Sequence, residues 1–413
     1  MVVWFTRLVL EARVSMRGAS RVLKLMSEQL GYDEPVPHWT TGRKWLQRQG
    51  HAQLTSPLPQ ADDWAWLVDH TVQIGQEKCL VIVGIQLRNL PPAGTSLRLQ
   101  DLHLVALVPR KSWTKVEVDE ALEAAVARTG VPRVIVNDHG ADVVGGVRLF
   151  QLRHRRTAEI YDLLHKAACL LKQRLEKNPR WLQFQSRLSS TRCAIQQTEL
   201  GFLTPPSPKN KARFMNLGDQ LKWAGHVLQI LRNPTPVVLQ QITVERLRNK
   251  LGWLEEHRAD VGEWSEWQQV MNTAVTFVNQ HGVYRGAVRD LKRRLPSRYQ
   301  SASGRQLAKD LVGFVQSESR KARRGERLPG STEILESCFG KFKVLEREQS
   351  KGGFTSLVIA FGSLLMKVSQ QTVTVALQNS TAQSVINWCR QHLGSTLFSK
   401  RKIAYGTSAT KVG

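Results

Sequence analysis

The spacing of apolar residues changes twice along the chain. In residues 1–60 apolar positions recur at the period of a helix, and Ser15 and Gly31 are suited to cap a second helix at its start and its end. A third helix is expected to end at Gly50. The sequence therefore predicts three short helices before a polar, proline-containing linker at 51–62.

The period then changes to that of strands. Short apolar runs rich in β-branched residues are separated by turn residues, a pattern typical of strands. These runs cover residues 64–69, 79–87, 102–108, 133–137 and 158–161. Helical spacing returns at 116–128 and 141–152, so the order of elements is βββαβαβ. This order predicts an α/β fold with a mixed parallel and antiparallel sheet.

From Leu163 onward the spacing is helical almost to the end of the chain. We expect residues 1–60 to form an N-terminal helical domain and residues 61–173 to form the first part of a sheet-containing core. Residues 174–330 are expected to be an all-helical insertion. Residues 331–413 then complete the core with a late helix and a helical tail.

The last N-terminal helix is basic and carries Arg43, Lys44 and Arg48. Three short helices with a basic third one resemble a helix-turn-helix domain, whose third helix enters a groove of DNA. The alternative is an ordinary helical cap over the next domain. We predict a DNA-binding domain in which these three cations contact DNA.

Composition narrows the partner and the compartment. The 413 residues include 59 Lys+Arg and 34 Asp+Glu, so the net charge of +25 favours a polyanion, nucleic acid above all, over a nonspecifically basic protein. Five cysteines without a CxxC pair argue against a disulfide framework and fit a reducing compartment. The longest strongly apolar stretch, 354–366, is shorter than the ~20 residues of a membrane span. We expect a cytoplasmic protein with no membrane partner.

Three carboxylates stand at positions that suit metal chemistry. Asp69 and Asp138 each close an apolar strand, where the backbone holds a side chain rigidly at the edge of a sheet. Glu336 lies beside the apolar stripe of a late helix, with Lys343 two turns further along the same edge. The alternatives are a turn or cap role for either aspartate, and Glu333 in place of Glu336.

Phosphodiester cleavage with two divalent metals needs a bridging aspartate and further carboxylates that hold the ions about 4 Å apart. Mg²⁺ prefers oxygen ligands and keeps positions for water and phosphate, and we expect Mn²⁺ to substitute for it. The sequence contains no GxxxxGK[ST], HExxH or GxSxG motif, which argues against the commonest NTPase, zincin and hydrolase classes. We therefore predict that Asp69, Asp138 and Glu336 bind two Mg²⁺ ions.

In their order and spacing these residues resemble the DDE triad of cut-and-paste DNA transposases, with Glu336 following Asp138 by 198 positions. The resemblance implies a ribonuclease H-like core in which an all-helical insertion precedes the glutamate helix. Asp162 and His165, directly after the fifth expected strand, match the [C/D]xxH signature of superfamilies with such insertions, the mutator-like and hAT groups among them. The resemblance implies that Asp162 and His165 order the side of the insertion that faces the active site. The alternative for His165 is a core or capping histidine.

The segment around Glu336 fits the resemblance only in part. The Ser-Thr-Glu-x-x-Glu sequence at 331–336 is similar to the end of the mutator-like catalytic core. In the Tyr-x2-Arg-x3-Glu-x6-Lys signature of one bacterial branch, Glu336 and Lys343 match, but Thr332 stands in place of the arginine. This departure weakens the assignment to that branch and leaves the superfamily resemblance.

Basic residues crowd around the expected catalytic helix. Residues 285–350 hold 16 Lys+Arg against 8 Asp+Glu. We expect four of these cations to contact DNA, which makes binding sensitive to salt. They are Arg323, Arg324, Lys341 and Lys343.

Three tryptophans mark the insertion, with Trp264 and Trp267 one helical turn apart and Trp253 preceding them. In the transposases that the chain resembles, a tryptophan of the insertion stacks on a flipped base. Because glutamates surround these tryptophans, core packing is the preferred interpretation.

The resemblance implies a transposase of a bacterial mobile element, bound to double-stranded DNA at transposon ends and at the target. It would cleave a strand with Mg²⁺-activated water and join the 3′-hydroxyl to target DNA, as a dimer or higher oligomer. The alternatives are an inactive or repurposed transposase that only binds DNA, and a structure-specific endonuclease on the same core.

Overall fold

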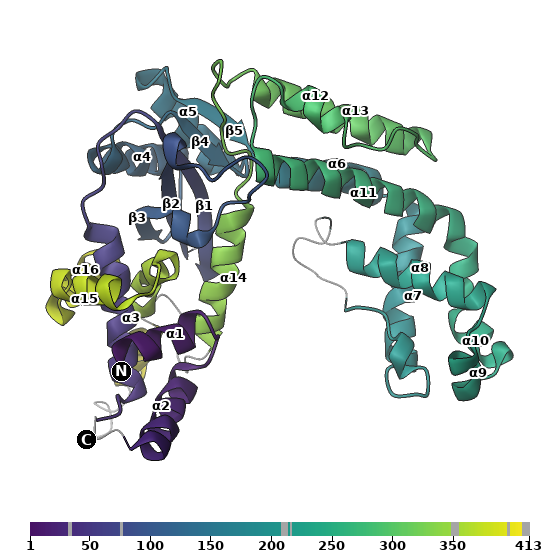
Figure 1. Cartoon of the computed structure of the whole chain (residues 1–413), viewed down its shortest axis with the longest axis horizontal. Helices are drawn as coiled ribbons and strands as arrows, with labels where there is room; N and C mark the ends of the chain where they lie inside the picture. The colour runs from purple at the N-terminus through teal and green to yellow at the C-terminus, as the bar shows by residue number, and fades with distance from the viewer. Residues whose placement is uncertain are drawn as a thin grey trace. The chain divides into compact units, whose positions relative to one another are not determined.

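The computed structural model describes residues 1–31, 35–74, 77–207, 214, 217–347, 355–394 and 397–406 (Figure 1). The chain divides into two compact units. Unit 1 combines residues 1–160 with 332–413, and unit 2 comprises residues 161–331. Unit 2 thus begins at the end of the fifth strand, 13 residues before the expected start of the insertion at 174.

Unit 1 is built around a mixed sheet, as the sequence predicts. In the described part of the chain, five strands are hydrogen-bonded in the order β3-β2-β1-β4-β5. They are β1 (Trp64–Ile74), β2 (Glu77–Gln86), β3 (His103–Arg110), β4 (Val134–Asn137) and β5 (Ala158–Tyr161). β2 pairs antiparallel with β1 and with β3, whereas β4 pairs parallel with β1. With α4 (Lys115–Thr129) and α5 (Ala141–Arg153), the predicted order βββαβαβ is confirmed.

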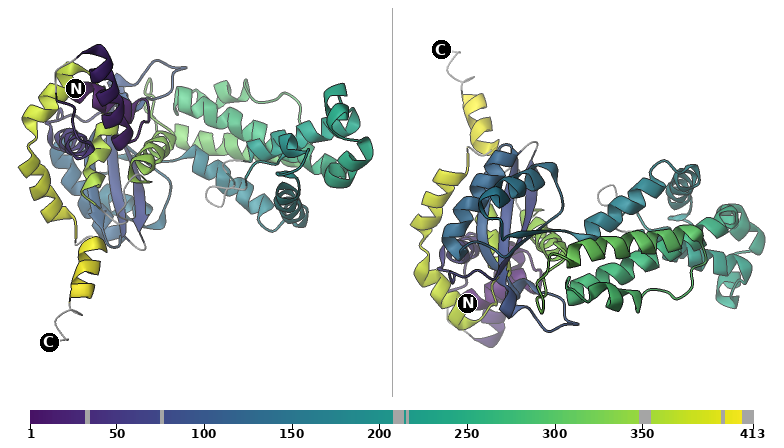
Figure 2. Two further views of the ribbon diagram at one scale, coloured as in Figure 1. Left: turned by 90° about the horizontal axis from the view of Figure 1, so that it is seen from below. Right: turned by 90° about the horizontal axis from the view of Figure 1, so that it is seen from above.

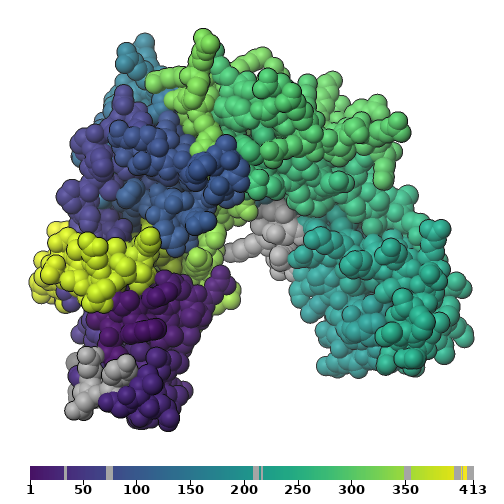
Figure 3. All heavy atoms as spheres, viewed as in Figure 1, coloured from purple at the N-terminus to yellow at the C-terminus, as the bar shows by residue number. Residues whose placement is uncertain are grey.

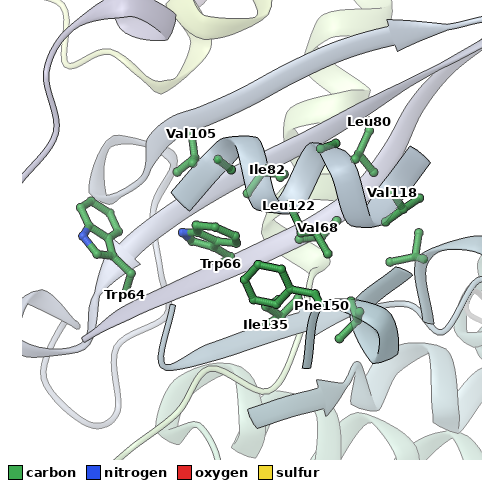
Figure 4. Packing of buried hydrophobic residues seen from close by; sticks show 14 residues of the cluster. Trp64, Trp66, Val68, Leu80, Ile82, Val105, Val118, Leu122, Ile135 and Phe150 are labelled. Atoms are coloured by element: carbon green, nitrogen blue, oxygen red, sulfur yellow. The ribbon is translucent and has the colours of Figure 1, made fainter. Parts of the chain in front are cut away.

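The helices α4 and α5 cover one face of this sheet (Figure 1). Trp66 and Val68 of β1 are fully buried beneath Leu122 of α4 and Phe150 of α5 (Figure 4). Fully burying side chains of this size stabilises the fold by about 1.5–3 kcal/mol each. Because side chains alternate along a strand, the residue that follows Val68, Asp69, lies on the opposite face.

That opposite face is covered by α14 (Glu333–Arg347) and η5 (Ser356–Leu365). α14 packs against β1, beside which it runs in Figure 1, and against η5. Phe339 and Phe342 of α14 contact Phe361 of η5, with ring centroids 5.9 and 5.7 Å apart. The apolar stripe predicted for the late helix is therefore the surface by which α14 is held.

The N-terminal helices pack within unit 1 against the C-terminal helices, a juxtaposition that Figure 2 shows. These helices are α1 (Val2–Leu10), α2 (Met16–Leu30), α3 (Trp39–Thr55), α15 (Gln370–Asn379) and α16 (Ala382–His392). The last helix of the described residues is α17 (Leu397–Gly406). The predicted caps of α2 are confirmed: Ser15 accepts a hydrogen bond from the Gly18 amide, and Gly31 adopts a φ of 67°.

The third helix does not end at Gly50, as the sequence predicts, but continues to Thr55. Gly50 is a packing residue, because a Cβ there would overlap the carbonyl oxygen of Ile359 in η5. The missing side chain lets α3 and η5 approach closely, so this glycine is required inside the helix rather than at its end.

Unit 2 is helical in its described residues apart from short 3₁₀ turns and one bridge. Its α-helices are α6 (Leu163–Leu175), α7 (Pro179–Ile195), α8 (Gly218–Arg232), α9 (Pro236–Gln241), α10 (Val244–Leu251), α11 (Arg258–His281), α12 (Ala287–Lys292) and α13 (Ala302–Ser319). The 3₁₀ turns of the whole chain, η5 aside, are η1 (Leu87–Asn89), η2 (Leu99–Asp101), η3 (Gly201–Leu203) and η4 (Gly252–His257). An antiparallel bridge joins Val283 to Leu328.

The core of unit 2 is aromatic. Trp264 is 1% exposed and contacts the rings of Trp181 and Phe184, while Trp267 is 5% exposed and donates a hydrogen bond to Ser303. The preferred interpretation of these tryptophans as core residues is confirmed.

Among the described residues, no helix is both long and apolar enough to cross a bilayer.

Candidate active site

Asp69 in β1 and Asp138, directly after β4, each follow the last paired residue of two neighbouring parallel strands. The last pair in the β1–β4 register is Val68 with Asn137, and the two aspartates are the next residues of each chain segment. Neighbouring strands lie about 4.8 Å apart. The fold thus brings two aspartates that are 69 positions apart in the sequence to the same end of a parallel strand pair.

The position of Asp69 within its strand differs from the prediction. β1 continues to Ile74, so Asp69 lies inside the strand and pairs with Val81 of β2. β4 is shorter and stops at Asn137. Asp69 therefore lies at the end of the parallel pairing between β1 and β4, and not at the end of β1 itself. The Oδ1 of Asp69 accepts a hydrogen bond from the amide of His70 at 2.6 Å, which fixes the carboxylate close to the backbone.

Asp138 begins a tight turn that its neighbours hold in place. Its Oδ1 accepts the Gly140 amide at 2.9 Å. The fully buried Asn137 accepts the His139 amide through Oδ1 and donates through Nδ2 to Glu159 on β5, at 2.8 and 3.0 Å. His139 has a φ of 65°, an uncommon conformation for a residue with a side chain. A strained turn clamped on both sides is typical of functional sites.

A second carboxylate lies close to Asp138. A Cβ on Gly140 would be 3.3 Å from a carboxylate oxygen of both Asp138 and Asp142, so the two side chains flank this glycine. Asp142 is in the first turn of α5, as the sequence predicts, and its Oδ2 lies 3.8 Å from Nδ1 of His70 and 4.0 Å from Nζ of Lys78.

His70 belongs to this group and is missing from the predicted site. Burial lowers the pKa of His70, while Asp142 and Asp138 act in the opposite direction and raise it. A signal for this histidine exists in the sequence, because both aspartates of the pair are followed by histidine, as Asp69-His70 and Asp138-His139. His139 in turn lies 3.5 Å from Glu159.

Glu336 lies half-buried near the start of α14, whereas its rival Glu333 is exposed. Both are in the first turns, where the helix dipole favours a negative charge. α14 covers the face of the sheet on which Asp69 lies. Among the described residues, however, no group of three or more His, Cys, Asp or Glu side chains is placed to hold a metal ion. The oxygen donors of the three carboxylates are of the kind that Mg²⁺ prefers.

α14 carries a further carboxyl group that the prediction omits. Glu346 is half-buried on the side of the helix that faces the sheet, and burial raises its pKa to about 7, although Lys343 counteracts this. Its charge acts on the fully buried thiol of Cys79 in β2. Lys343 itself is exposed. A glutamate on the buried face of a helix is visible in the helical period, four positions after Phe342.

Asp162 and His165 lie in unit 2, at the start of α6. The fully buried Asp162 caps this helix by accepting the Leu164 amide at 2.7 Å, and its other oxygen lies 3.1 Å from Nδ1 of His165. The structure gives the pair a capping role. Its predicted role in ordering the catalytic site stays a prediction.

Two of the three cations predicted on α3 are turned toward the protein. Arg48 donates hydrogen bonds to the carbonyl oxygens of Ser380 and Leu377, and Arg43 donates to the hydroxyl of Ser356 at 3.3 Å. Lys44 is exposed. The third helix is thus the centre of a helical assembly, and DNA contact by these residues stays a prediction.

Arg323 and Arg324 are exposed in the loop after α13. The bridge between Val283 and Leu328 holds this loop beside the segment that leads to α12, and Arg285 donates a hydrogen bond to the carbonyl of Ala322. Exposed cations of α12 and its flanks therefore extend the basic surface beyond the two predicted arginines. They include Arg289, Lys292, Arg293 and Arg294. On α14, Lys341 is half-buried.

No family model and no curated protein matches this chain. The interpretation of the site therefore depends on its own geometry and on the resemblance of its motifs.

Proposed function

We propose that this protein is a DNA transposase of the DDE type, with a ribonuclease H-like core in unit 1 and the helical insertion in unit 2. The observation that carries the proposal is that Asp69 and Asp138 directly follow the last paired residues, Val68 and Asn137, of two parallel neighbouring strands. Glu336 lies on the helix that covers the face of Asp69. The strand order β3-β2-β1-β4-β5 supports the proposed core.

In this proposal Asp69 and Asp138 hold Mg²⁺ and Glu336 completes the set when DNA is bound. Two bound ions would activate the attacking oxygen and stabilise the leaving 3′-oxygen. Asn137 and the Gly140 amide keep Asp138 in one orientation, so that its carboxylate needs no rearrangement. We infer a dimeric or larger assembly on transposon ends and target DNA, in a bacterial cytoplasm.

The cations have separate tasks. The exposed arginines of the α12–α13 region, Arg323 and Arg324 among them, would track the phosphate backbone of double-stranded DNA. Lys343, exposed two turns after Glu336, would meet a phosphate near the cleaved bond. The net charge of +25 supports both contacts.

The test is strand cleavage and joining on plasmid DNA with Mg²⁺ or Mn²⁺. We expect Asp138→Asn and Asp69→Asn to abolish both steps while binding to DNA persists. Asp63→Asn, a matched change at the other end of β1 where the carboxylate pairs with Arg88, should leave both steps unchanged. Equal activity of the wild type and Asp138→Asn would refute the proposal. Cutting of branched DNA without joining would indicate a structure-specific endonuclease.

One observation favours the second candidate, a DNA-binding protein without catalysis. Within the described residues no cluster of three potential ligands is formed. A repurposed transposase would bind DNA through its basic surfaces and would neither cut nor join in any metal. The same assay separates the two, because the catalytic proposal requires that Asp138→Asn changes the products and not only the affinity.

A further inference from the structure

A pocket of about 870 Å³ lies in unit 1 between the N-terminal and the C-terminal helices. In Figure 3 these two groups of helices, purple and yellow, lie directly against one another. The walls come from α2, α3 and α16, with single contributions from α14 and the start of η5. The volume is within the range of about 300–1,000 Å³ that is usual for ligand sites.

The side chains that line this pocket are unusual in their charge. Among the described residues of the lining, five are cationic and none is an aspartate or a glutamate. The cations are Arg17, Arg43, Lys44, Arg48 and Arg390. Arg48 already donates hydrogen bonds to two backbone carbonyl oxygens, but the other four cations line the same cavity. Such a field selects a ligand with negative charge.

Arg43 gives the strongest indication that the pocket binds an anion. Its guanidinium is partly buried, and its hydrogen bond to Ser356 at 3.3 Å involves only one of its nitrogens. No carboxylate pairs with it among the residues that the structure describes, and burial lowers its pKa. A partly desolvated guanidinium without a counter-ion is costly, and a phosphate that accepts a forked pair of hydrogen bonds would supply what is missing.

The rest of the wall is apolar and includes an aromatic ring. Trp39 is half-exposed, and the guanidinium of Arg17 lies 5.0 Å from its ring centroid. Met16, Val385 and Ile386 form apolar walls around it. A ring beside phosphate-binding cations is the combination by which proteins hold unpaired nucleotides, with the base stacked and the backbone in the positive groove.

From this arrangement we propose that the pocket binds an unpaired nucleotide segment of single-stranded DNA. Arg43, Arg17 and Lys44 contact its phosphates, and Trp39 stacks on a base. This inference rests on the proposed function, in which strands are separated and exchanged. Leu345 of α14 forms part of the wall, nine residues after Glu336, or about 14 Å along the helix. The pocket and the candidate active site therefore share one helix.

The experiment measures binding of a fluorescent poly(dT) strand and of a blunt duplex by polarisation, in EDTA so that no cleavage takes place. We expect Arg43→Gln, Arg17→Gln and Trp39→Ala each to weaken binding of the single strand at least about fivefold, the low end for a lost base stack. Arg21→Gln removes the same charge one turn further along α2, outside the pocket, and should have a much smaller effect.

Each outcome decides the inference. Unchanged affinity of the Arg17→Gln and Trp39→Ala variants for poly(dT) would overturn it, as would equal losses on the duplex and the single strand. If thymidine monophosphate alone competes as well as the strand, the site is one for mononucleotides and the strand is excluded. Thermal melting identifies a variant that fails to fold. Failure of the transposase proposal would show as absent cleavage and joining, with single-strand binding retained.

Discussion

Neutralising Glu346 tests how unit 1 is held together at the face that carries Asp69. This glutamate lies half-buried on α14, on the same side of the helix as Phe342, and its charge acts on the buried Cys79 of β2. Lys343, one turn earlier, is exposed to solvent and compensates it only in part. The wild-type protein therefore holds a carboxyl group in a place that favours its neutral form.

The size and sign of the effect follow from the pKa. Burial raises the pKa of Glu346 from 4.5 to about 7, so the folded state binds more protons than the unfolded state between these values. Stability consequently falls as the pH rises from about 4.5 to about 7 and stays low above it. The difference corresponds to about 3.4 kcal/mol, which partial exposure reduces to about 1–2 kcal/mol.

Glu346→Gln keeps the shape of the neutral side chain and removes the titration. We expect the variant to be more stable than the wild type by about 1–2 kcal/mol near pH 8.5 and about equally stable near pH 4, below the pKa of the unfolded state. The measurement is hydrogen exchange of peptides from α14 and β2, which reports on unit 1 separately from unit 2. Glu333→Gln, a change at an exposed position of the same helix, should change the stability by the same amount at both pH values. An equal gain at both pH values for Glu346→Gln would refute the reasoning.

Three further substitutions test other contacts. Gly50→Ala puts a Cβ onto the carbonyl oxygen of Ile359, so we expect a loss of about 1–3 kcal/mol in urea denaturation, whereas Gly225→Ala, with open space around it, should be neutral or stabilising. Arg48→Met leaves two carbonyl oxygens at the end of α15 without their donor and should cost about 1–3 kcal/mol, seen as faster hydrogen exchange in α15. Asp162→Ala removes the cap of α6 and should destabilise it by about 1 kcal/mol, measured by exchange in its first turn.

The order of strands and helices in unit 1 could be predicted because each element has its own local signal. The strands are continuous apolar runs, since both faces of the sheet are covered, and α4 shows a clear period between its Thr114 cap and Gly130. The end of β1 could not be predicted in the same way. After Asp69 polar residues interrupt the apolar ones (His-Thr-Val-Gln-Ile), so the continuous apolar run ends there, although pairing with β2 extends the strand to Ile74.

The packing of the N-terminal helices had no local signal at all. Arg48 contacts Ser380 across 332 positions, and nothing near either residue indicates the other. Basic residues on a short helix are equally compatible with a DNA-reading face and with a helix that anchors distant carbonyls. The two arginines of α3 thus differ in their contacts. Arg48 donates hydrogen bonds to backbone carbonyls of the fold, whereas Arg43 has no carboxylate partner among the described residues.

The candidate site was predictable to the extent that it depends on the strands. Apolar runs that end in aspartate predicted Asp69 and Asp138, and the parallel register brings both residues to the same end of the β1–β4 pair. The contribution of His70 and Asp142 depends on how α5 starts after the turn at Gly140, which no periodicity encodes. The same holds for Glu336, whose distance from the aspartates is set by tertiary packing of α14.

α14 connects the candidate active site, the basic pocket and a buried carboxyl group of unit 1. Its first turns carry Glu336, Leu345 forms part of the wall of the basic pocket, and the next residue, Glu346, faces the sheet with a raised pKa. Since one rigid helix joins these positions, a ligand in the pocket that fixes α14 also fixes Glu336. A loss of activity in a Leu345 or Glu346 variant therefore has to be compared with single-strand binding before it is assigned to catalysis.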